Sequence, residues 1–359
     1  MNTIDYAKSA CEVIMNKYSA EDLPPARSFH YHQGVFLSGM EQTYLNTKDR
    51  KYFNYIKDWV DSIITPDGVV SKFNPNTLDD KRSATLLFRL LEETGDSRYE
   101  KPLHMFRESL RDWPSNPEGG FGHKIYERQH EMWLDGLYMA SPLLTMYGAK
   151  FGDESCFEDA IRQAKLMWKH NRDEKTGLMY HAWDYSKKRE WANPETGCAP
   201  EVWGRAMGWY IVALNEMLDY IPSDFKERAL LVEYVKEYIA AIVKYQDKDT
   251  GLWYQVVDKG YDSRNWIESS CSALFICGIA TAIKRGYVGA EYTENVKRGF
   301  DGLTSILEKD EYGGMIIPKI CIGTGVGSFE FYMERPTVEN DLHGMGAFIL
   351  AANACVGIV

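Results

Sequence analysis

Cysteine is scarce in this sequence of 359 residues. The seven cysteines are odd in number, widely scattered, and form no Cys-x-x-Cys pair. A disulfide framework or a cysteine-rich zinc site is therefore not expected, and we predict buried, reduced thiols in a cytoplasmic protein. The first residues also lack a basic stretch followed by an apolar run, so no signal peptide is expected.

Long apolar runs and an excess of positive charge are lacking as well. No window is apolar over the roughly 20 residues that a membrane-spanning helix needs. The formal net charge is −11, with 41 Lys and Arg against 52 Asp and Glu. This balance argues against nucleic acid or an anionic membrane as the main partner. A small anionic ligand is still compatible, because one local Arg or Lys can reverse the field. The oligomeric state is left open.

Alternating strand patterns are almost absent, whereas helical periodicity runs through most of the chain. The apolar fraction of 45% can build a sizeable core. The pattern predicts twelve helices, at roughly 2–19, 32–46, 50–64, 80–94, 97–112, 131–149, 153–172, 203–220, 224–246, 269–286, 290–308 and 341–357.

The connections between these helices alternate between two kinds. Tight turns are expected at 47–49, 94–96, 151–153, 222–224 and 285–286. Longer segments with glycine and aromatic residues are expected at 67–70, 119–123, 176–181, 250–254 and 312–315. This alternation describes helical hairpins in a ring. The predicted fold is all-α, a single (α/α)6 barrel of six helical hairpins that spans residues 1–359.

The helices that follow the long segments are expected to form the inner layer, with all their N-termini at the same end of the barrel. Their first turns carry unusual polar and aromatic content, near Tyr31, Asp79, Asp135, 203–209, 268–270 and 340–343. The helix bodies are ordinary Leu, Ile and Ala. One end of the barrel should therefore form a ligand-binding cleft.

Asp135 is the only formally charged residue between Met132 and Met146. At helical spacing Met132, Tyr138 and Met139 share its face, so the carboxylate points the same way as an apolar stripe. Such a carboxylate is either paired or has a raised pKa, and a raised pKa makes a usable general acid. The alternative is an aspartate that caps the helix N-terminus.

Asp79 and Asp80 open another predicted helix. One of them is expected to cap it, which leaves the other for a ligand. The histidines best placed in the cleft are His123 next to Lys124, His181, and the pair His30 and His32. Residues two apart do not share a helix face, and no HExxH pattern is present, so we expect no metal and no cofactor. Hydrogen bonding to a substrate is the better functional interpretation.

The segment Trp203–Trp209 places two tryptophans and Arg205 at a helix entrance. Indole faces stack on sugar rings, and Arg offers a planar fork to a carboxylate. The alternative is core packing by the tryptophans with Arg205 as a helix cap. The glycine-rich segment 323–327 follows no strand and lacks the Lys-Ser/Thr of a P-loop, so we discount it as a phosphate site.

Seven motifs together resemble glycoside hydrolase family 105, the unsaturated rhamnogalacturonyl hydrolases, which are related to the unsaturated glucuronyl hydrolases. They run in family order through the chain: Phe29–Gly34, Leu78–Asp80, Gly120–Lys124, Met132–Met139, Gly177–Asp184, Trp203–Trp209 and Asn340–Gly344. The family has the (α/α)6 barrel fold. The resemblance implies removal of a 4,5-unsaturated uronic acid from the non-reducing end of oligosaccharides left by polysaccharide lyases.

The resemblance also implies the roles of particular residues. The general acid/base falls on Asp135, and the second carboxylate matches Asp79 better than Asp80. Asp79 would orient the sugar or water and raise the pKa of Asp135. Substrate contacts fall on Tyr31, His123, Lys124, His181, Trp203, Arg205 and Trp209. The implied reaction is hydration of the C4–C5 double bond, with unsaturated galacturonyl-rhamnose as the default substrate.

Two departures from the family pattern put the leaving sugar in doubt. Ala206-Met207 stands where many relatives have Gly-Asn, and Phe121-Gly122 stands where a tryptophan often precedes the histidine. The rival interpretations are a hydrolase of another unsaturated glucuronyl oligosaccharide, a sugar epimerase or isomerase on the same barrel, and a non-catalytic carbohydrate-binding scaffold.

Overall fold

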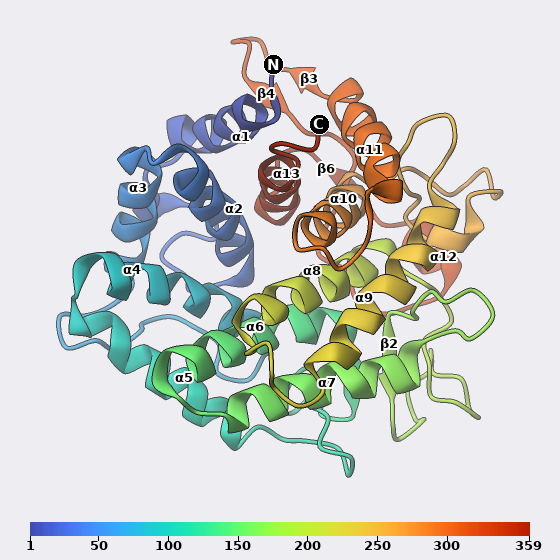
Figure 1. Ribbon diagram of the computed structural model, residues 1–359, viewed down its shortest axis with the longest axis horizontal. Helices are drawn as coiled ribbons and strands as arrows, with labels where there is room; N and C mark the ends of the chain where they lie inside the picture. The colour runs from blue at the N-terminus through green and yellow to red at the C-terminus, as the bar shows by residue number, and fades with distance from the viewer.

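The computed structural model describes residues 1–359 and is almost entirely helical (Figure 1). Its thirteen α-helices are α1 (Thr3–Lys17), α2 (Tyr31–Thr47), α3 (Arg50–Asp61), α4 (Leu86–Thr94), α5 (Glu100–Arg111), α6 (Leu134–Phe151), α7 (Ser155–Asn171), α8 (Gly204–Tyr220), α9 (Arg228–Ile242), α10 (Ser269–Lys284), α11 (Thr293–Ser305), α12 (Phe329–Met333) and α13 (Leu342–Ala354).

The remaining regular structure is short. Six strands pair as three antiparallel ribbons, β1 (Glu131–Trp133) with β2 (Ala182–Asp184), β3 (Glu308–Lys309) with β4 (Met315–Ile316), and β5 (Ile320–Cys321) with β6 (Thr337–Val338). Six 3-10 segments cover Ala20–Asp22, Asp79–Thr85, Ser97–Tyr99, Val243–Tyr245, Val257–Lys259 and Ala290–Tyr292.

The inner layer is a closed ring. In order around it lie α2, the segment formed by Asp79–Thr85 and α4, then α6, α8, α10 and α13, and α13 packs back against α2. The outer helices α1, α3, α5, α7, α9 and α11 surround this ring (Figure 1). The predicted (α/α)6 barrel is therefore confirmed, and the inner helices are the ones that follow the long connections.

The two layers differ because their sequences differ. The inner helix α13 has no Lys, Arg, Asp or Glu within it, and its residues from Leu342 to Asn353 are all buried. A helix that is apolar all round is stable only when it is enclosed by other helices. The outer helix α3 instead buries one face, with Trp59 and Ile56 turned inward and Asp58 between them exposed.

Glycines allow the first and last inner helices to close the ring. A Cβ added to Gly346 would lie 2.6 Å from the Val35 backbone, and one added to Gly39 would lie 3.0 Å from the Gly346 carbonyl. No side chain larger than hydrogen fits such a contact without moving a backbone. The N-terminal end of α2 and that of α13 are therefore held side by side.

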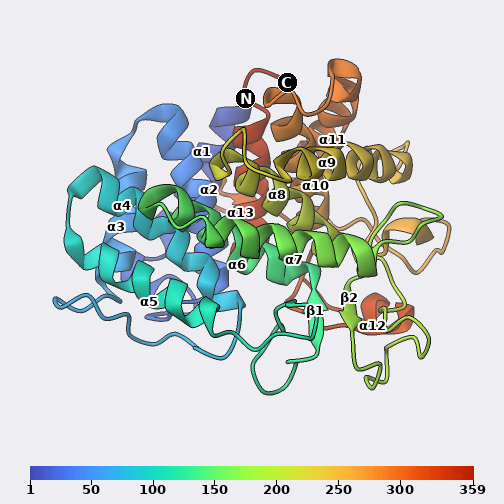
Figure 2. The same cartoon turned by 60° about the horizontal axis from the view of Figure 1, so that its bottom comes forward.

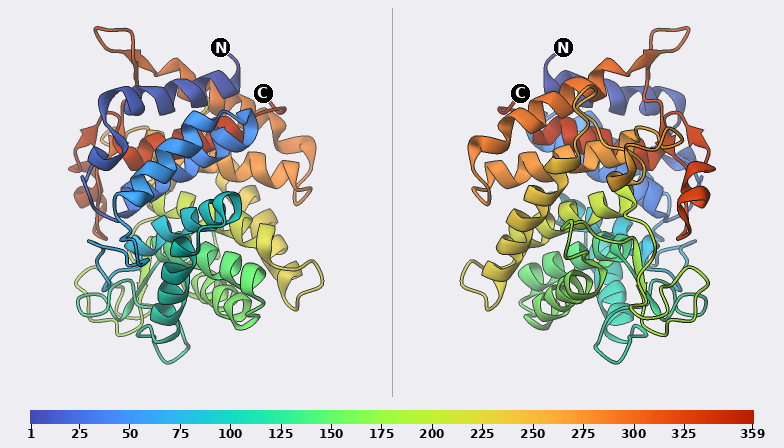
Figure 3. Two further views of the ribbon diagram at one scale, coloured as in Figure 1. Left: turned by 90° about the vertical axis from the view of Figure 1, so that its left-hand side faces the viewer. Right: turned by 90° about the vertical axis from the view of Figure 1, so that its right-hand side faces the viewer.

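The long connections gather at one end of the barrel. Figures 2 and 3 show the loops that contain β1, β2 and α12 together on one side of the molecule. The tight turns lie at the other ends of the helices, and Gly95 and Gly152 end α4 and α6 in the left-handed conformation that suits glycine. The predicted cleft end is thus the end where the inner helices begin.

Three details of the helix prediction were wrong. The helix expected at 131–149 begins at Leu134, because residues 131–133 pair with 182–184 as a ribbon. The start of the helix expected at 80–94 is 3-10 as far as Thr85. The short helix α12 was not predicted at all, because five residues are too few to leave a periodic signal.

Two expectations from composition can be compared with the structure. All seven cysteines are buried and free, which agrees with the prediction of reduced thiols without disulfides. None of the helices combines the length and the apolar character that crossing a bilayer requires.

Candidate active site

The β1–β2 ribbon brings Asp135 and His181 together. Asp135 lies in the first turn of α6, directly after β1, and His181 directly precedes β2. The backbone N–H of Leu134 donates to the carbonyl of His181 (3.1 Å), which extends the ribbon by one step. The two side chains then meet, with His181 Nε2 3.2 Å from Asp135 Oδ2. Two residues far apart in sequence are thus fixed by local backbone pairing.

Asp135 does not cap its helix. Its side chain accepts no hydrogen bond from the backbone at the start of α6, where Trp133 is the capping residue without a side-chain bond. Its Oδ2 is buried and faces His181, while 14% of the side chain stays exposed. The structure therefore favours the functional interpretation of this aspartate over the capping alternative.

The pKa of Asp135 is lower than usual, and the expected rise was wrong. Burial raises the pKa, but the hydrogen bond and charge of His181, together with the charges of His123 and Arg205, lower it more. His181, His123 and Arg205 reach the carboxylate from three different segments, and their combined stabilisation of its charged form exceeds both desolvation and any repulsion from Asp79. In the ligand-free protein Asp135 is therefore an ionised carboxylate.

His181 is held on its other side by a residue that the sequence did not suggest. Its Nδ1 lies 2.7 Å from the hydroxyl of Tyr332, in α12, and the imidazole is completely buried. Tyr332 also stacks on Trp203, with ring centroids 5.8 Å apart. A hydroxyl can donate to Nδ1, and the proton on Nε2 then points at Asp135.

Asp79 belongs to the same group, whereas Asp80 does not. His123 Nε2 lies 3.4 Å from Asp79 Oδ1, and Thr77 Oγ1 donates to Asp79 Oδ2 (3.0 Å). Asp80 is buried and accepts from the Asn74 backbone N–H (2.6 Å), and burial raises its pKa to about 7. Neither aspartate caps the 3-10 segment through its side chain, so the expected cap was wrong.

Aromatic rings form the walls between these polar groups. Trp133 stacks flat on His123, with centroids 4.3 Å apart and planes at 6°, and its edge meets His181. Trp203 lies against the other face of His181 at 4.6 Å. Burial lowers the pKa of His123, although Asp79 and Asp135 oppose this effect. The histidines are thereby fixed in orientation beside the two carboxylates.

Arg205 is buried in the same region and does not cap a helix. It lies over Trp203, and its guanidinium donates to the carbonyls of Cys321 and Ile322 (2.5 and 2.8 Å). Tyr31 faces this region from α2. Burial raises the pKa of its hydroxyl, with Arg205 opposing and Asp79 adding to the rise. The loop 323–327 borders the same space, since a Cβ on Gly323 would lie 3.7 Å from the Tyr31 hydroxyl.

Two of the predicted substrate contacts lie apart from this group. Lys124 is at the rim, 30% exposed, with its Nζ 3.5 Å from Glu127. Trp209 is buried in the barrel and stacks on Tyr138 at 4.7 Å, a placement that favours its packing alternative. Phe121, Ala206 and Met207, which differ from the usual family pattern, are also buried in the core.

The fold and this group of residues define a class of protein. An (α/α)6 barrel has two carboxylates, two fixed histidines, a buried arginine and indole walls at one end, although the chain as a whole is acidic. This is the chemistry of a site that binds an acidic sugar and transfers a proton to it or from it.

The comparisons with known proteins agree. The sequence profile of Glycosyl Hydrolase Family 88 matches residues 6–357, and the chain belongs to this family. A family 105 glycoside hydrolase from C. acetobutylicum ATCC 824 is 33% identical, with a TM-score of 0.93 over 98% of this chain and 99% of that one. The chain is therefore a glycoside hydrolase, as the motifs indicated.

Two further relatives bear on the fold and the substrate. The unsaturated rhamnogalacturonyl hydrolase YesR of Bacillus subtilis (strain 168) is 29% identical over 298 residues, which cover 82% of this chain and 79% of YesR. The unsaturated glucuronyl hydrolase of Bacillus sp. GL1 is 16% identical with a TM-score of 0.72, over 98% of this chain and 95% of that one. The second likeness supports the barrel fold alone.

Proposed function

We propose that this hydrolase removes a 4,5-unsaturated uronic acid from the non-reducing end of lyase-generated oligosaccharides, with unsaturated galacturonyl-rhamnose as its preferred substrate. The observation that supports this most is the Asp135–His181 pair at 3.2 Å, beside Arg205 and among aromatic walls. The similarity to YesR supports rhamnose as the leaving sugar.

In the proposed first step Asp135 gives a proton to C4 of the substrate. The electron pair of the C4–C5 double bond forms the new C–H bond, and the ring oxygen stabilises the cation that remains at C5. The carboxylate then takes a proton from water as the water oxygen bonds to C5. The resulting hemiketal opens to a C5 ketone, and the hemiacetal left at C1 releases the remaining sugar.

This route needs only one carboxylate to act as acid and then as base. His181 suits the task, because its Nε2–H stabilises the ionised form of Asp135 between the two proton transfers. Asp79 and His123 form a second close pair, at 3.4 Å, that would hold the sugar hydroxyls. Arg205 would contribute positive charge for the uronate, which offsets the acidic surface of the chain.

The pH dependence follows from the direction of the pKa of Asp135. A carboxyl group with a lowered pKa is ionised at neutral pH, and its protonated fraction grows tenfold for each unit of fall in pH. We expect kcat/KM to rise as the pH falls from weakly alkaline to weakly acidic. The check is a pH–rate profile of kcat/KM, and a profile that is flat over that range would contradict protonation by Asp135.

A panel of lyase products tests the substrate assignment. The panel should contain unsaturated galacturonyl-rhamnose and unsaturated glucuronyl disaccharides with other leaving sugars. The reaction of each is measured as the loss of the ultraviolet absorbance of the unsaturated uronate. We expect the highest kcat/KM for the rhamnose disaccharide. A higher kcat/KM for a glucuronyl substrate would contradict the rhamnogalacturonan assignment but not the reaction. No loss of absorbance with any member of the panel would contradict the reaction itself.

A further inference from the structure

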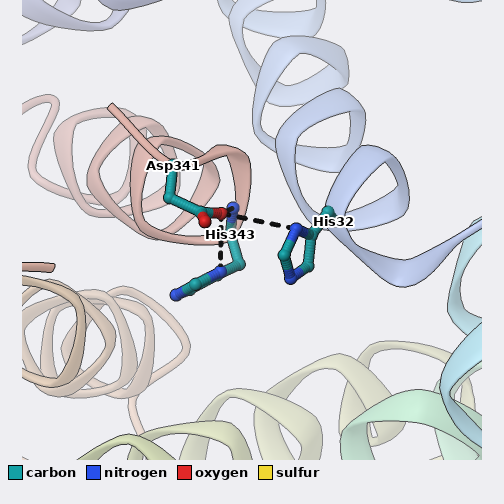
Figure 4. A group of neighbouring side chains, drawn as sticks. All are labelled: His32, Asp341 and His343. Atoms are coloured by element: carbon teal, nitrogen blue, oxygen red, sulfur yellow. Dashed lines mark hydrogen bonds and ion pairs between the residues drawn. The ribbon is translucent and has the colours of Figure 1, made fainter. Parts of the chain in front are cut away.

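A second cluster of titratable side chains lies where the inner ring closes (Figure 4). His32 comes from the first turn of α2, Asp341 is the N-terminal capping residue of α13, and His343 follows in the first turn of α13. His32 Nδ1 lies 3.4 Å from Asp341 Oδ1, and His343 Nδ1 lies 2.8 Å from the same oxygen. One atom from each residue lies within 4.8 Å of the other two.

The hydrogen bond on the far side of His343 determines what its Nδ1 can do. Nε2 lies 3.0 Å from the carbonyl of Cys321, which can only accept, so Nε2 carries the proton. In the neutral ring Nδ1 is then a lone pair that points at a carboxylate oxygen. His343 is fully buried, and its Nδ1 has no well-aligned hydrogen-bond partner. Two acceptors this close repel unless a proton or a cation lies between them.

The second imidazole presents its Nδ1 to the same carboxylate oxygen. The two rings lie close together, with centroids 4.8 Å apart, so both imidazoles face Asp341 from adjacent helices. His30 does not compete for the position, because its Nδ1 accepts the backbone N–H of His32 (3.3 Å).

We propose that His32, Asp341 and His343 bind a divalent transition-metal ion, with zinc as the preferred ion. Two imidazoles and one carboxylate are a common ligand set for zinc, and a ligand histidine usually donates its other N–H to a carbonyl or carboxylate, as His343 does to Cys321. A tetrahedral zinc ion holds its ligand atoms roughly 3.4 Å apart. The His32–Asp341 separation has this value already.

The surroundings allow the ion to enter but limit its affinity. His32 and Asp341 are each about one-fifth exposed and border a cavity of about 480 Å³ beside α1, so water can complete the coordination. Arg205 donates to the same Cys321 carbonyl as His343, and its positive charge opposes a second cation. We therefore expect a dissociation constant on the order of micromolar, weaker than that of a structural zinc site.

The position of the cluster suggests what the ion does. It would join the N-terminal ends of the first and last inner helices, which already pack closely through Gly39 and Gly346. A ligand that binds only the folded chain stabilises it, and a link between distant chain segments constrains the unfolded state most. This structural role is independent of Asp135 and of the reaction proposed above.

The test is zinc binding by calorimetry and thermal unfolding after treatment with a chelator. We expect one zinc ion per chain, a rise in the unfolding temperature on adding zinc chloride, and a visible absorption band when cobalt(II) replaces zinc. His32→Gln and Asp341→Asn should each weaken zinc binding at least tenfold. Asparagine keeps the helix cap, so Asp341→Asn is expected to fold.

The matched control is His104→Gln, which removes an exposed histidine on α5 far from the cluster. This variant should bind zinc as the wild type does. The proposal is overturned if the wild type takes up no stoichiometric zinc, or if the two cluster variants, shown by circular dichroism to be folded, bind zinc as tightly as His104→Gln.

Discussion

Asp135→Asn is expected to lower kcat by at least about a hundredfold, a typical contribution of general acid/base catalysis. The amide has the size of the carboxylate and can still accept a hydrogen bond from His181 Nε2, so the first turn of α6 and its packing are retained. The amide has no proton to give to C4 and cannot take one from water. The loss should therefore fall on kcat, with a smaller change in KM.

The measurement is steady-state turnover of an unsaturated disaccharide by wild type and variant, together with thermal unfolding followed by circular dichroism. Asp58→Asn is the matched control, because Asp58 is an exposed aspartate on the outer helix α3. The control should keep full activity. An Asp135→Asn protein that is folded and retains most of its activity would remove Asp135 from the mechanism.

Asp79→Asn is expected to lower kcat/KM by at least about tenfold, because a small displacement of the substrate from its reactive position commonly lowers the rate by this much or more. Asp79 faces His123 at 3.4 Å, and an amide in its place weakens this contact and its hold on a sugar hydroxyl. The prediction separates the two adjacent aspartates, which the sequence could not separate.

Asp80→Asn is the comparison that makes this prediction specific. Asp80 accepts the Asn74 backbone N–H, and burial raises its pKa to about 7, so a neutral amide resembles its buried protonated form. We expect near wild-type kcat/KM for Asp80→Asn. If Asp80→Asn lost more activity than Asp79→Asn while both remained folded, the assignment of the second carboxylate would move to Asp80.

Much of the fold could be predicted from the sequence, because it depends on local patterns. The alternation of tight turns and long segments with glycine gave the order of inner and outer helices, and the ring formed by α2, α6, α8, α10 and α13 agrees with it. Local patterns did not show that residues 131–133 form a strand. Their partner, 182–184, lies far along the chain, and three residues carry no periodic signal.

The candidate site was predicted in its residues but not in its electrostatics. A raised pKa for Asp135 was inferred from its apolar neighbours in sequence, whereas His181, His123 and Arg205 approach from other elements and lower it. Tyr332 was missed because it lies in a helix of five residues after a glycine-rich loop. The three aromatic residues among 329–332, beside that loop, were the one available signal.

The cluster of His32, Asp341 and His343 shows the same limit. The helical spacing of His30 and His32 led to the expectation that their rings lie apart and that no metal binds, but His30 caps α2 from outside the helix and the two rings lie 5.0 Å apart. The partners of His32 come instead from the opposite end of the chain, where α13 closes the ring against α2. Only the folded barrel brings them together.

The most direct test of the proposed reaction is to run it in D2O on unsaturated galacturonyl-rhamnose and to examine the early product by nuclear magnetic resonance. We predict loss of the ultraviolet absorbance, release of rhamnose, and one deuterium at C4 of the uronate product. Release of rhamnose with the chromophore intact and no deuterium at C4 would show ordinary attack at the anomeric carbon and contradict protonation of C4 by Asp135.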